Sequence, residues 1–283
     1  MKKKSTGERL EFYDFSDVTV EHLHRYAIAN DFVKDKVILD IASGEGYGSY
    51  ILSKNASKVI GVDIDKETVL EAQKKYINSN LSFIVGSADK IPIDSSTIDV
   101  VVSFETIEHH DKHEEMFLEI KRVLKSDGIL IMSSPDKKYY SDIPGFKNKF
   151  HVKELYFDEF KNLVNNNFKF SDFLFQKAFN FNSFISNEEL FNKTDLFFGD
   201  NSLLKKDVLE PLYNIAIASN EKFIAVNPSL FNGKIIADLQ LENILCMREA
   251  WFVDKIYNTN SYRLGNFILA PFFFVKKLIK RIN

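Results

Sequence analysis

The segment Val37–Gly48, VILDIASGEGYG, restricts the fold of this chain more than any other stretch. Four of its first five residues are apolar, which is typical of a strand buried on both faces of a parallel sheet. Three glycines follow at alternate positions: Gly44, Gly46 and Gly48. Glycine permits positive φ and lets a ligand approach the backbone, and the helix expected next directs unpaired N–H groups at that ligand. The segment therefore predicts an α/β fold with a ligand site at a strand-to-helix turn.

The residues around this turn indicate which ligand it holds. The dinucleotide fingerprint Gly-x-Gly-x-x-Gly is not met, because Ser49 stands where its third glycine would be. Asp40 at the end of the strand and Glu45 inside the turn would repel a pyrophosphate. The same acids would attract an amine and a sulfonium. We therefore expect S-adenosylmethionine at this turn, and the acids disfavour an NAD-dependent enzyme.

A second short apolar strand, Lys58–Asp63, ends in an acid 19 residues after Gly44. In this kind of β-α-β unit an acid about 20 residues after the turn binds the ribose hydroxyls. The spacing therefore predicts that Asp63 binds a ribose.

Residues 37 to about 136 resemble a class I S-adenosylmethionine-dependent methyltransferase of the small-molecule or sugar type, as found in bacterial surface-polysaccharide biosynthesis. The segments that carry the resemblance are Leu39–Gly48, Gly61–Asp63, Gly86–Ile93, Ser103–His109 and Val123–Ile131. The resemblance implies an α/β, Rossmann-like fold with a seven-stranded, mostly parallel sheet. It also implies helices on both faces, an antiparallel last strand and a methyltransferase activity.

Apolar runs in this order predict the remaining strands at residues 81–85, 97–104, 129–132, 168–175 and 222–226. The last run would form the antiparallel strand. We expect a methyltransferase domain over residues 1–230, with an insertion at about 176–220 that serves as a lid or a dimer contact. Residues 231–283 are expected to form a helical extension with an amphipathic, basic tail.

The resemblance assigns donor-binding roles to residues on several segments. A helix predicted over 21–30 would bring Arg25 to the donor's carboxylate, although a solvated amphipathic helix explains the same pattern. Ser87–Asp89 would bind adenine, although Asp89 also suits a capping role. The complete expected set is Arg25, Asp40, Ala42, Gly44, Glu45, Gly46, Asp63, Ile64, Ser87, Ala88, Asp89, Phe104 and Glu105.

Histidines near the donor site are the candidates for a base, since an alcohol acceptor must lose a proton and histidine titrates near neutral pH. His109 directly follows the fourth strand and is the first candidate, before His151 and then His110. The run from Glu108 to Asp111 also contains metal-ligand types. Adjacent side chains on one segment are expected to point apart, so we expect no metal site.

Composition limits the cell compartment and the partners. A net charge of −3 argues against nucleic-acid binding, and the single cysteine, Cys246, fits a reducing compartment and is expected to be a buried small hydrophobe. No signal peptide and no spanning helix are evident. Residues 261–283 end in nine apolar residues and four cations, which suits a membrane-surface anchor or a contact with a glycosyltransferase or a second subunit. We therefore expect a cytoplasmic protein, peripheral on the inner face of the membrane.

The predicted function is O-methylation of a sugar or glycan precursor in cell-surface polysaccharide biosynthesis. Other acceptors left open by the sequence are a phosphate group, a lipid and a small metabolite. A different class of function, a donor-binding scaffold without turnover that recruits a glycosyltransferase, is the remaining alternative. A homodimer is compatible with the insertion.

Overall fold

The computed structural model describes residues 15–265, 267 and 269. The chain separates into two compact units, with the division between Lys234 and Ile235. The first unit contains the sheet and the second contains the helix α7, Lys234–Tyr257.

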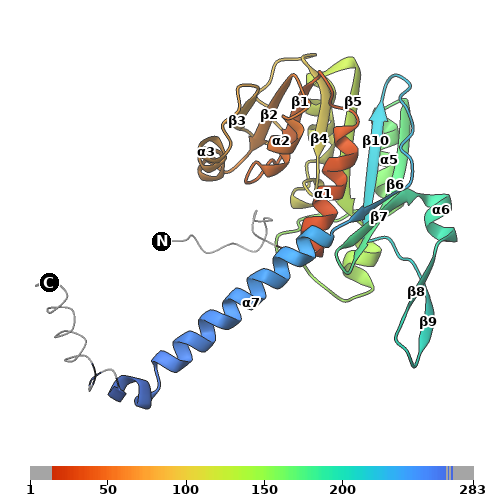
Figure 1. Cartoon of the computed structure of the whole chain (residues 1–283). Helices are drawn as coiled ribbons and strands as arrows, with labels where there is room; N and C mark the ends of the chain where they lie inside the picture. The colour runs from red at the N-terminus through yellow and green to blue at the C-terminus, as the bar shows by residue number, and fades with distance from the viewer. Residues whose placement is uncertain (1–14, 266, 268, 270–283) are drawn as a thin grey trace, which may run out of the picture. The chain divides into compact units, whose positions relative to one another are not determined.

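The main sheet of the first unit has nine strands, in the order β11-β7-β6-β10-β5-β4-β1-β2-β3 (Figure 1). Its strands are β1 (Val37–Ile41), β2 (Lys58–Asp63), β3 (Leu81–Val85), β4 (Ile98–Ser103), β5 (Leu124–Pro135), β6 (Phe170–Phe179), β7 (Asn182–Asn187), β10 (Tyr213–Ser219) and β11 (Ser229–Asn232). Strands β1 to β5 pair in parallel, and β10 runs antiparallel between β5 and β6. The predicted α/β class is confirmed.

The antiparallel strand lies at Tyr213–Ser219, so the prediction of a strand at 222–226 was wrong. All seven residues of β10 are buried, because this strand pairs with neighbours on both edges and is covered on both faces. In contrast, Ile224 is 87% exposed and lies outside any strand. Residues 213–219 and 222–226 both carry short apolar runs. Only the strand pairing in the folded chain shows which of the two forms the antiparallel strand.

The sheet has nine strands instead of seven because the stretch expected as an insertion adds to its edge. Residues 176–220 contain β7, the helix α6 (Glu188–Lys193), the hairpin of β8 (Asp195–Gly199) and β9 (Leu204–Val208), and β10 itself. Strand β11 then pairs with β7. The role of this stretch as a lid or dimer contact stays a prediction.

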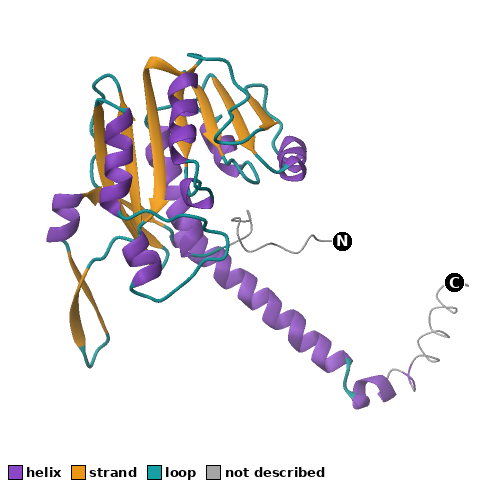
Figure 2. Ribbon diagram, turned by 180° about the vertical axis from the view of Figure 1, so that it is seen from behind, coloured by secondary structure: helices purple, strands orange, loops and turns teal. Residues whose placement is uncertain are grey.

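Helices cover both faces of the sheet (Figure 2). The helices of the first unit that flank the sheet are α1 (Asp17–Asn30), α2 (Tyr47–Leu52), α3 (Lys66–Lys75), α4 (His113–Val123) and α5 (Phe157–Asn167). Alternate residues of the central strands face opposite ways, so two cores form. One core joins α4 and α5 to residues such as Leu39 and Leu130, and the other joins α1 and α2 to residues such as Ile38 and Ile131.

Helix α1 confirms the helix predicted over 21–30. Ala27 is exposed, whereas Glu21, His24 and Arg25 are buried, so the interpretation as a solvated helix was wrong. These buried polar groups have partners in the sheet: His24, for example, contacts Ser183 on β7 and Ser229 on β11, both at 2.9 Å.

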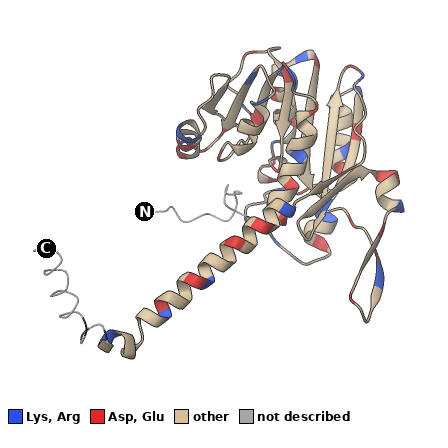
Figure 3. Ribbon diagram, viewed as in Figure 1, with Lys and Arg blue, Asp and Glu red and all other residues tan. Residues whose placement is uncertain are grey.

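The second unit contains the predicted helical extension. Charged residues of both signs occur along the whole of α7 (Figure 3). Among the described residues, no helix combines the length and the apolar character that crossing a membrane requires. Cys246 is exposed on this helix, which corrects its expected burial. Most of the apolar and basic tail, at positions 266, 268 and 270–283, lies outside the described residues.

Candidate active site

A cavity of about 580 Å³ lies at the carboxyl ends of strands β1 to β4. Parallel strands present their carboxyl ends at one edge, which is where open α/β sheets bind ligands. The size falls within the range of about 300–1,000 Å³ that is usual for small-molecule sites. Helix α1 and the loop after β5 complete the wall.

Ten of the thirteen predicted donor residues line this cavity. They are Ala42, Gly44, Glu45, Asp63, Ile64, Ser87, Ala88, Asp89, Phe104 and Glu105. The other three, Arg25, Asp40 and Gly46, do not line the cavity. Each of them instead contacts or packs against other residues of the protein interior. The three histidines proposed as bases, His109, His110 and His151, all border the same space.

Asp63 holds the glycine turn in position. Its Oδ2 accepts a hydrogen bond from the Gly44 N–H and its Oδ1 accepts one from the Asp65 N–H, both at 2.9 Å. Gly44 has a φ of +53°, and no atom lies within 4 Å of the place where its Cβ would stand. In contrast, a Cβ on Gly46 would lie 2.6 Å from the Phe83 ring. Gly44 therefore borders open ligand space, and Gly46 is required for packing.

Asp40 supports the turn from inside the protein. Its carboxylate accepts a hydrogen bond from Ser49 Oγ at 2.6 Å and a longer one from the Tyr26 hydroxyl at 3.4 Å. Burial raises the pKa of Asp40 to about 7. Gly48 makes room for Tyr26, since a Cβ there would lie 1.9 Å from the Tyr26 ring. Asp40 does not line the cavity, so its contact with the donor stays a prediction.

Two other acids of the cavity are held by lysines. Glu45 pairs with Lys75 at 3.1 Å. Asp89 accepts hydrogen bonds from Lys112 and from the Ser87 hydroxyl, which lower the pKa of Asp89 to about 2. The negative charge around the glycine turn is thus partly balanced by this chain's own cations, contrary to the electrostatic argument made from the sequence.

Arg25 is buried away from the cavity, so its predicted contact with the donor's carboxylate is not supported. Its Nη1 lies 2.7 Å from Glu105 Oε1 and donates to Ser133 Oγ at 2.9 Å. Its guanidinium lies 4.5 Å from the centre of the Tyr213 ring. No local pattern marks this partnership, because its members come from distant parts of the chain.

Two non-glycine residues of the cavity have left-handed backbone conformations: Ala42 after β1 with φ 56°, and Glu105 after β4 with φ 49°. Such conformations cost about 1–3 kcal/mol each and often occur at ligand sites. They turn the chain sharply at the two strand ends that border the cavity.

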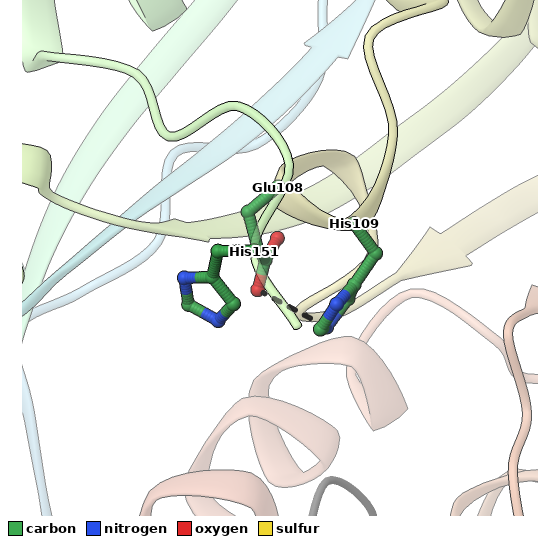
Figure 4. Close-up of side chains that lie close together, drawn as sticks. All are labelled: Glu108, His109 and His151. Carbon is green, nitrogen blue, oxygen red and sulfur yellow. Dashed lines mark ion pairs between the residues drawn. The ribbon is translucent and has the colours of Figure 1, made fainter. Parts of the chain in front are cut away.

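Glu108, His109 and His151 come together on one side of the cavity (Figure 4). Each offers one ligand-type atom, and these atoms all lie within 4.8 Å of one another. Glu108 and His109 lie on the 3₁₀ turn η1, Ile107–His109, with Glu108 Oε1 at 3.9 Å from His109 Nε2. The expectation that adjacent side chains on this segment point apart is therefore wrong for this pair.

Hydrogen bonds fix the rings of both histidines. His109 Nδ1 lies 3.1 Å from the Phe150 carbonyl oxygen, and His151 Nδ1 lies 2.6 Å from Glu154 Oε1. Both partners are acceptors, so in the neutral form of each ring Nδ1 carries the proton and Nε2 keeps a lone pair. Asn148 Nδ2 lies 2.9 Å from His151 Nε2, as expected for a donor facing that lone pair.

Glu108 is almost fully buried, at 1% exposure. Burial raises the pKa of its carboxyl well above the ordinary value, and the nearby Glu105 charge adds to this effect. His110, the third predicted base, lies 3.3 Å from Met116 Sδ through its Nε2, and burial lowers its pKa.

Several aromatic residues at the cavity were not predicted from the sequence. Tyr47, Tyr140 and Tyr213 line it, and the Tyr140 ring stacks on His151 with a centroid distance of 5.1 Å. The tyrosine pair at 139–140 after a strand was visible as a pattern, but nothing local indicated its partner.

Comparisons with known proteins agree with this arrangement. Residues 39–132 match the family model of a methyltransferase domain. A protein of Mycolicibacterium smegmatis named "Probable S-adenosylmethionine-dependent methyltransferase" is 33% identical over 121 residues, which cover 42% of this chain and 46% of the relative. A fatty-acid O-methyltransferase of the same organism is 23% identical over 133 residues, covering 44% and 48%. The chain thus spans about half the length of these relatives.

Solved structures show the same fold. The crystal structure of an S-adenosylmethionine-dependent methyltransferase from Archaeoglobus fulgidus superposes with a TM-score of 0.53 at 17% identity, covering 72% of this chain and 94% of that one. In sequence, residues 39–132 are thus similar to a methyltransferase domain, and the fold agrees with that of a solved S-adenosylmethionine-dependent methyltransferase.

Proposed function

We propose that this protein transfers a methyl group from S-adenosylmethionine to an oxygen atom of a sugar or glycan precursor, in the assembly of a cell-surface polysaccharide. One observation carries the proposal: a glycine turn of the donor-binding kind and two histidines with fixed Nε2 lone pairs border the same cavity.

The residues present fit the donor. The open space beside Gly44 and the neighbouring Asp63 carboxylate suit a ribose, whose hydroxyls would donate to that carboxylate. Ala88 and Ile64 offer apolar surface to the adenine. When bound, S-adenosylmethionine supplies a methyl group on a positively charged sulfur. Because Arg25 is engaged by Glu105, the donor's carboxylate would have to find another partner.

The remaining residues would position the acceptor and take its proton. Correct positioning alone can lower the barrier to a displacement by several kcal/mol. His109 and His151 both direct an Nε2 atom into the space shared with Glu108. Either could accept a proton from a hydroxyl placed there, His151 once the Asn148 amide that faces its Nε2 has moved away. His110 has its Nε2 against Met116 and suits this role less well.

A lipid carboxylate or hydroxyl is the second candidate acceptor. It is favoured by the similarity to a fatty-acid O-methyltransferase, although that protein shares only 23% identity over the matched part. Polar and aromatic groups at the acceptor side, such as Asn148 and Tyr140, favour a hydroxyl-rich acceptor instead.

The test is an acceptor panel with purified protein and S-adenosylmethionine labelled in its methyl group. Sugar nucleotides, oligosaccharide precursors, fatty acids and hydroxylated lipids are compared, and the product is identified by mass spectrometry. We expect O-methylation of a sugar. Transfer to lipids alone would replace the sugar by the second candidate. Donor binding without any transfer would favour a non-catalytic scaffold, in which the tail at 261–283 recruits a glycosyltransferase.

A further inference from the structure

We propose that Glu108, His109 and His151 form a binding site for a divalent transition-metal ion. They offer two imidazoles and one carboxylate, a donor set that ions such as Zn²⁺ accept. Within the described parts of the chain, their ligand-type atoms lie within 4.8 Å of one another, with Glu108 and His109 on the turn after β4 and His151 on the loop after β5 (Figure 4).

The surroundings of the two histidines match those of metal ligands. A metal-bound histidine almost always donates its other ring N–H to a carboxylate or a carbonyl group. His151 does so to Glu154 Oε1 at 2.6 Å, and His109 to the Phe150 carbonyl at 3.1 Å. Both Nδ1 atoms are thus occupied, which leaves both Nε2 atoms as the ligands.

The burial of the Glu108 carboxylate is a second, independent argument for a metal ion at this place. It is 1% exposed, and its Oε2 makes no hydrogen bond to any described residue. A carboxyl group that is buried in this way keeps a negative charge only with a cation or several donors nearby. The buried cation Arg25 is already paired with Glu105 at 2.7 Å. A metal ion beside Glu108 would satisfy the carboxylate.

Zn²⁺ and Mn²⁺ fit this donor set better than Mg²⁺ or Ca²⁺, which prefer oxygen ligands. Ligand atoms about 2.1 Å from one ion lie roughly 3–3.5 Å apart, so the three side chains would rotate slightly inward on binding. The amide of Asn148, now 2.9 Å from His151 Nε2, would give way to the ion.

Three protein ligands leave coordination positions open, as in catalytic sites. An acceptor hydroxyl bound there would lose its proton more easily, as metal-bound water does. This catalytic consequence rests on the proposed function, whereas metal binding itself does not.

The test is calorimetric titration of the full chain with ZnCl₂ and, separately, MnCl₂ after treatment with a chelator, with MgCl₂ as the comparison. We expect one ion per chain. Affinity should fall at least tenfold in each of Glu108→Gln, His109→Asn and His151→Asn. Glu154→Gln should weaken binding about 10- to 100-fold through the His151 ring. His110→Asn, which changes the next histidine on the same cavity wall, is the control and should keep the wild-type metal affinity.

Circular dichroism melting and S-adenosylmethionine affinity of each variant show whether the fold and the donor side are intact. Absence of one-to-one binding of both Zn²⁺ and Mn²⁺ would overturn the proposal, as would an equal loss in His110→Asn. Metal binding without methyl transfer to any acceptor would overturn the proposed function alone. Methyl transfer that is indifferent to chelator, in a protein that binds no ion, would overturn the metal site alone.

Discussion

Arg25 and Glu105 form an ion pair at 2.7 Å, in which the arginine side chain is fully buried and the glutamate side chain is 17% exposed. The Ser133 hydroxyl contacts both, accepting from Arg25 at 2.9 Å and donating to Glu105 at 2.6 Å. The pair thus joins α1 to the ends of β4 and β5, directly behind the cavity.

Replacing Arg25 by Met should destabilise the protein by about 3–5 kcal/mol, because it leaves Glu105 without its counter-ion. Urea unfolding followed by circular dichroism measures this loss. The double variant Arg25→Met, Glu105→Gln should recover most of it, since no uncompensated charge remains. A loss below about 1 kcal/mol in the single variant would show that solvent already compensates the charge of Glu105.

Asp63→Ala should weaken binding of S-adenosylmethionine at least tenfold, as expected from losing hydrogen bonds to a charged group worth about 1.5–3 kcal/mol. It removes an acceptor for the ribose and the bond to the Gly44 N–H. Calorimetric titration with the donor is the measurement. Asp65→Asn is the matched control, because the Asp65 side chain caps α3 and asparagine caps nearly as well. Equal affinities of the two variants would contradict the role of Asp63.

Asp40→Asn should change how stability depends on pH. The pKa of Asp40 is raised by burial from 3.8 to about 7, so the folded protein keeps a proton that the unfolded chain loses. The Asp40 contribution to stability is therefore present below about pH 4 and is lost as pH rises to about 7. Unfolding free energies of both proteins from pH 4.5 to 8 test this. The unfolding free energy of Asp40→Asn relative to that of the wild type should increase with pH. A difference that does not change with pH would refute the raised pKa of Asp40.

Gly48→Ala should destabilise the protein by about 1–3 kcal/mol through overpacking, since its Cβ would lie 1.9 Å from the Tyr26 ring. The same change in a Tyr26→Leu background should cost less, because the ring is gone. A double-mutant cycle by urea unfolding measures the coupling. Additive costs would mean that the third glycine serves something other than Tyr26.

His109→Ala should slow turnover about 10²- to 10⁴-fold, the usual contribution of an acid or base. It should leave the affinity for S-adenosylmethionine within about twofold, because His109 belongs to the loop after β4 and not to the glycine turn. Rates with the acceptor identified in the panel are compared with calorimetric donor affinities. Unchanged turnover would exclude His109 from the chemistry.

Most strands of the parallel half, such as β1, β2 and β4, could be predicted because they are buried on both faces and so carry continuous apolar runs. Strands β1, β2 and β3 lie where the sequence placed them. Strand β10 could not be distinguished from the apolar run at 222–226, because its burial comes from pairing with β5 and β6. Such pairing is a property of the folded chain and leaves no local mark.

Most residues predicted to bind the donor do line the cavity, since they directly follow consecutive strands. The predictions that failed concern the partners of charged and titratable side chains. Arg25 looked available to a ligand, but Glu105 binds it across a long sequence separation. The side chains of Glu108 and His109 were expected to point apart because the two residues are adjacent in the sequence. The 3₁₀ turn instead brings them together, and the loop after β5 adds His151 to the cluster.

Three consecutive residues of α1 serve three distant regions. His24 contacts the added strands β7 and β11, Arg25 the loop after β4, and Tyr26 the carboxylate beneath the glycine turn. They leave the helix in different directions, roughly 100° apart. The segment 39–132, which matches the methyltransferase family, therefore depends on α1 for its stability. Expressed alone, the segment would lack these contacts. A chimera that transfers the segment into another protein would have to include α1.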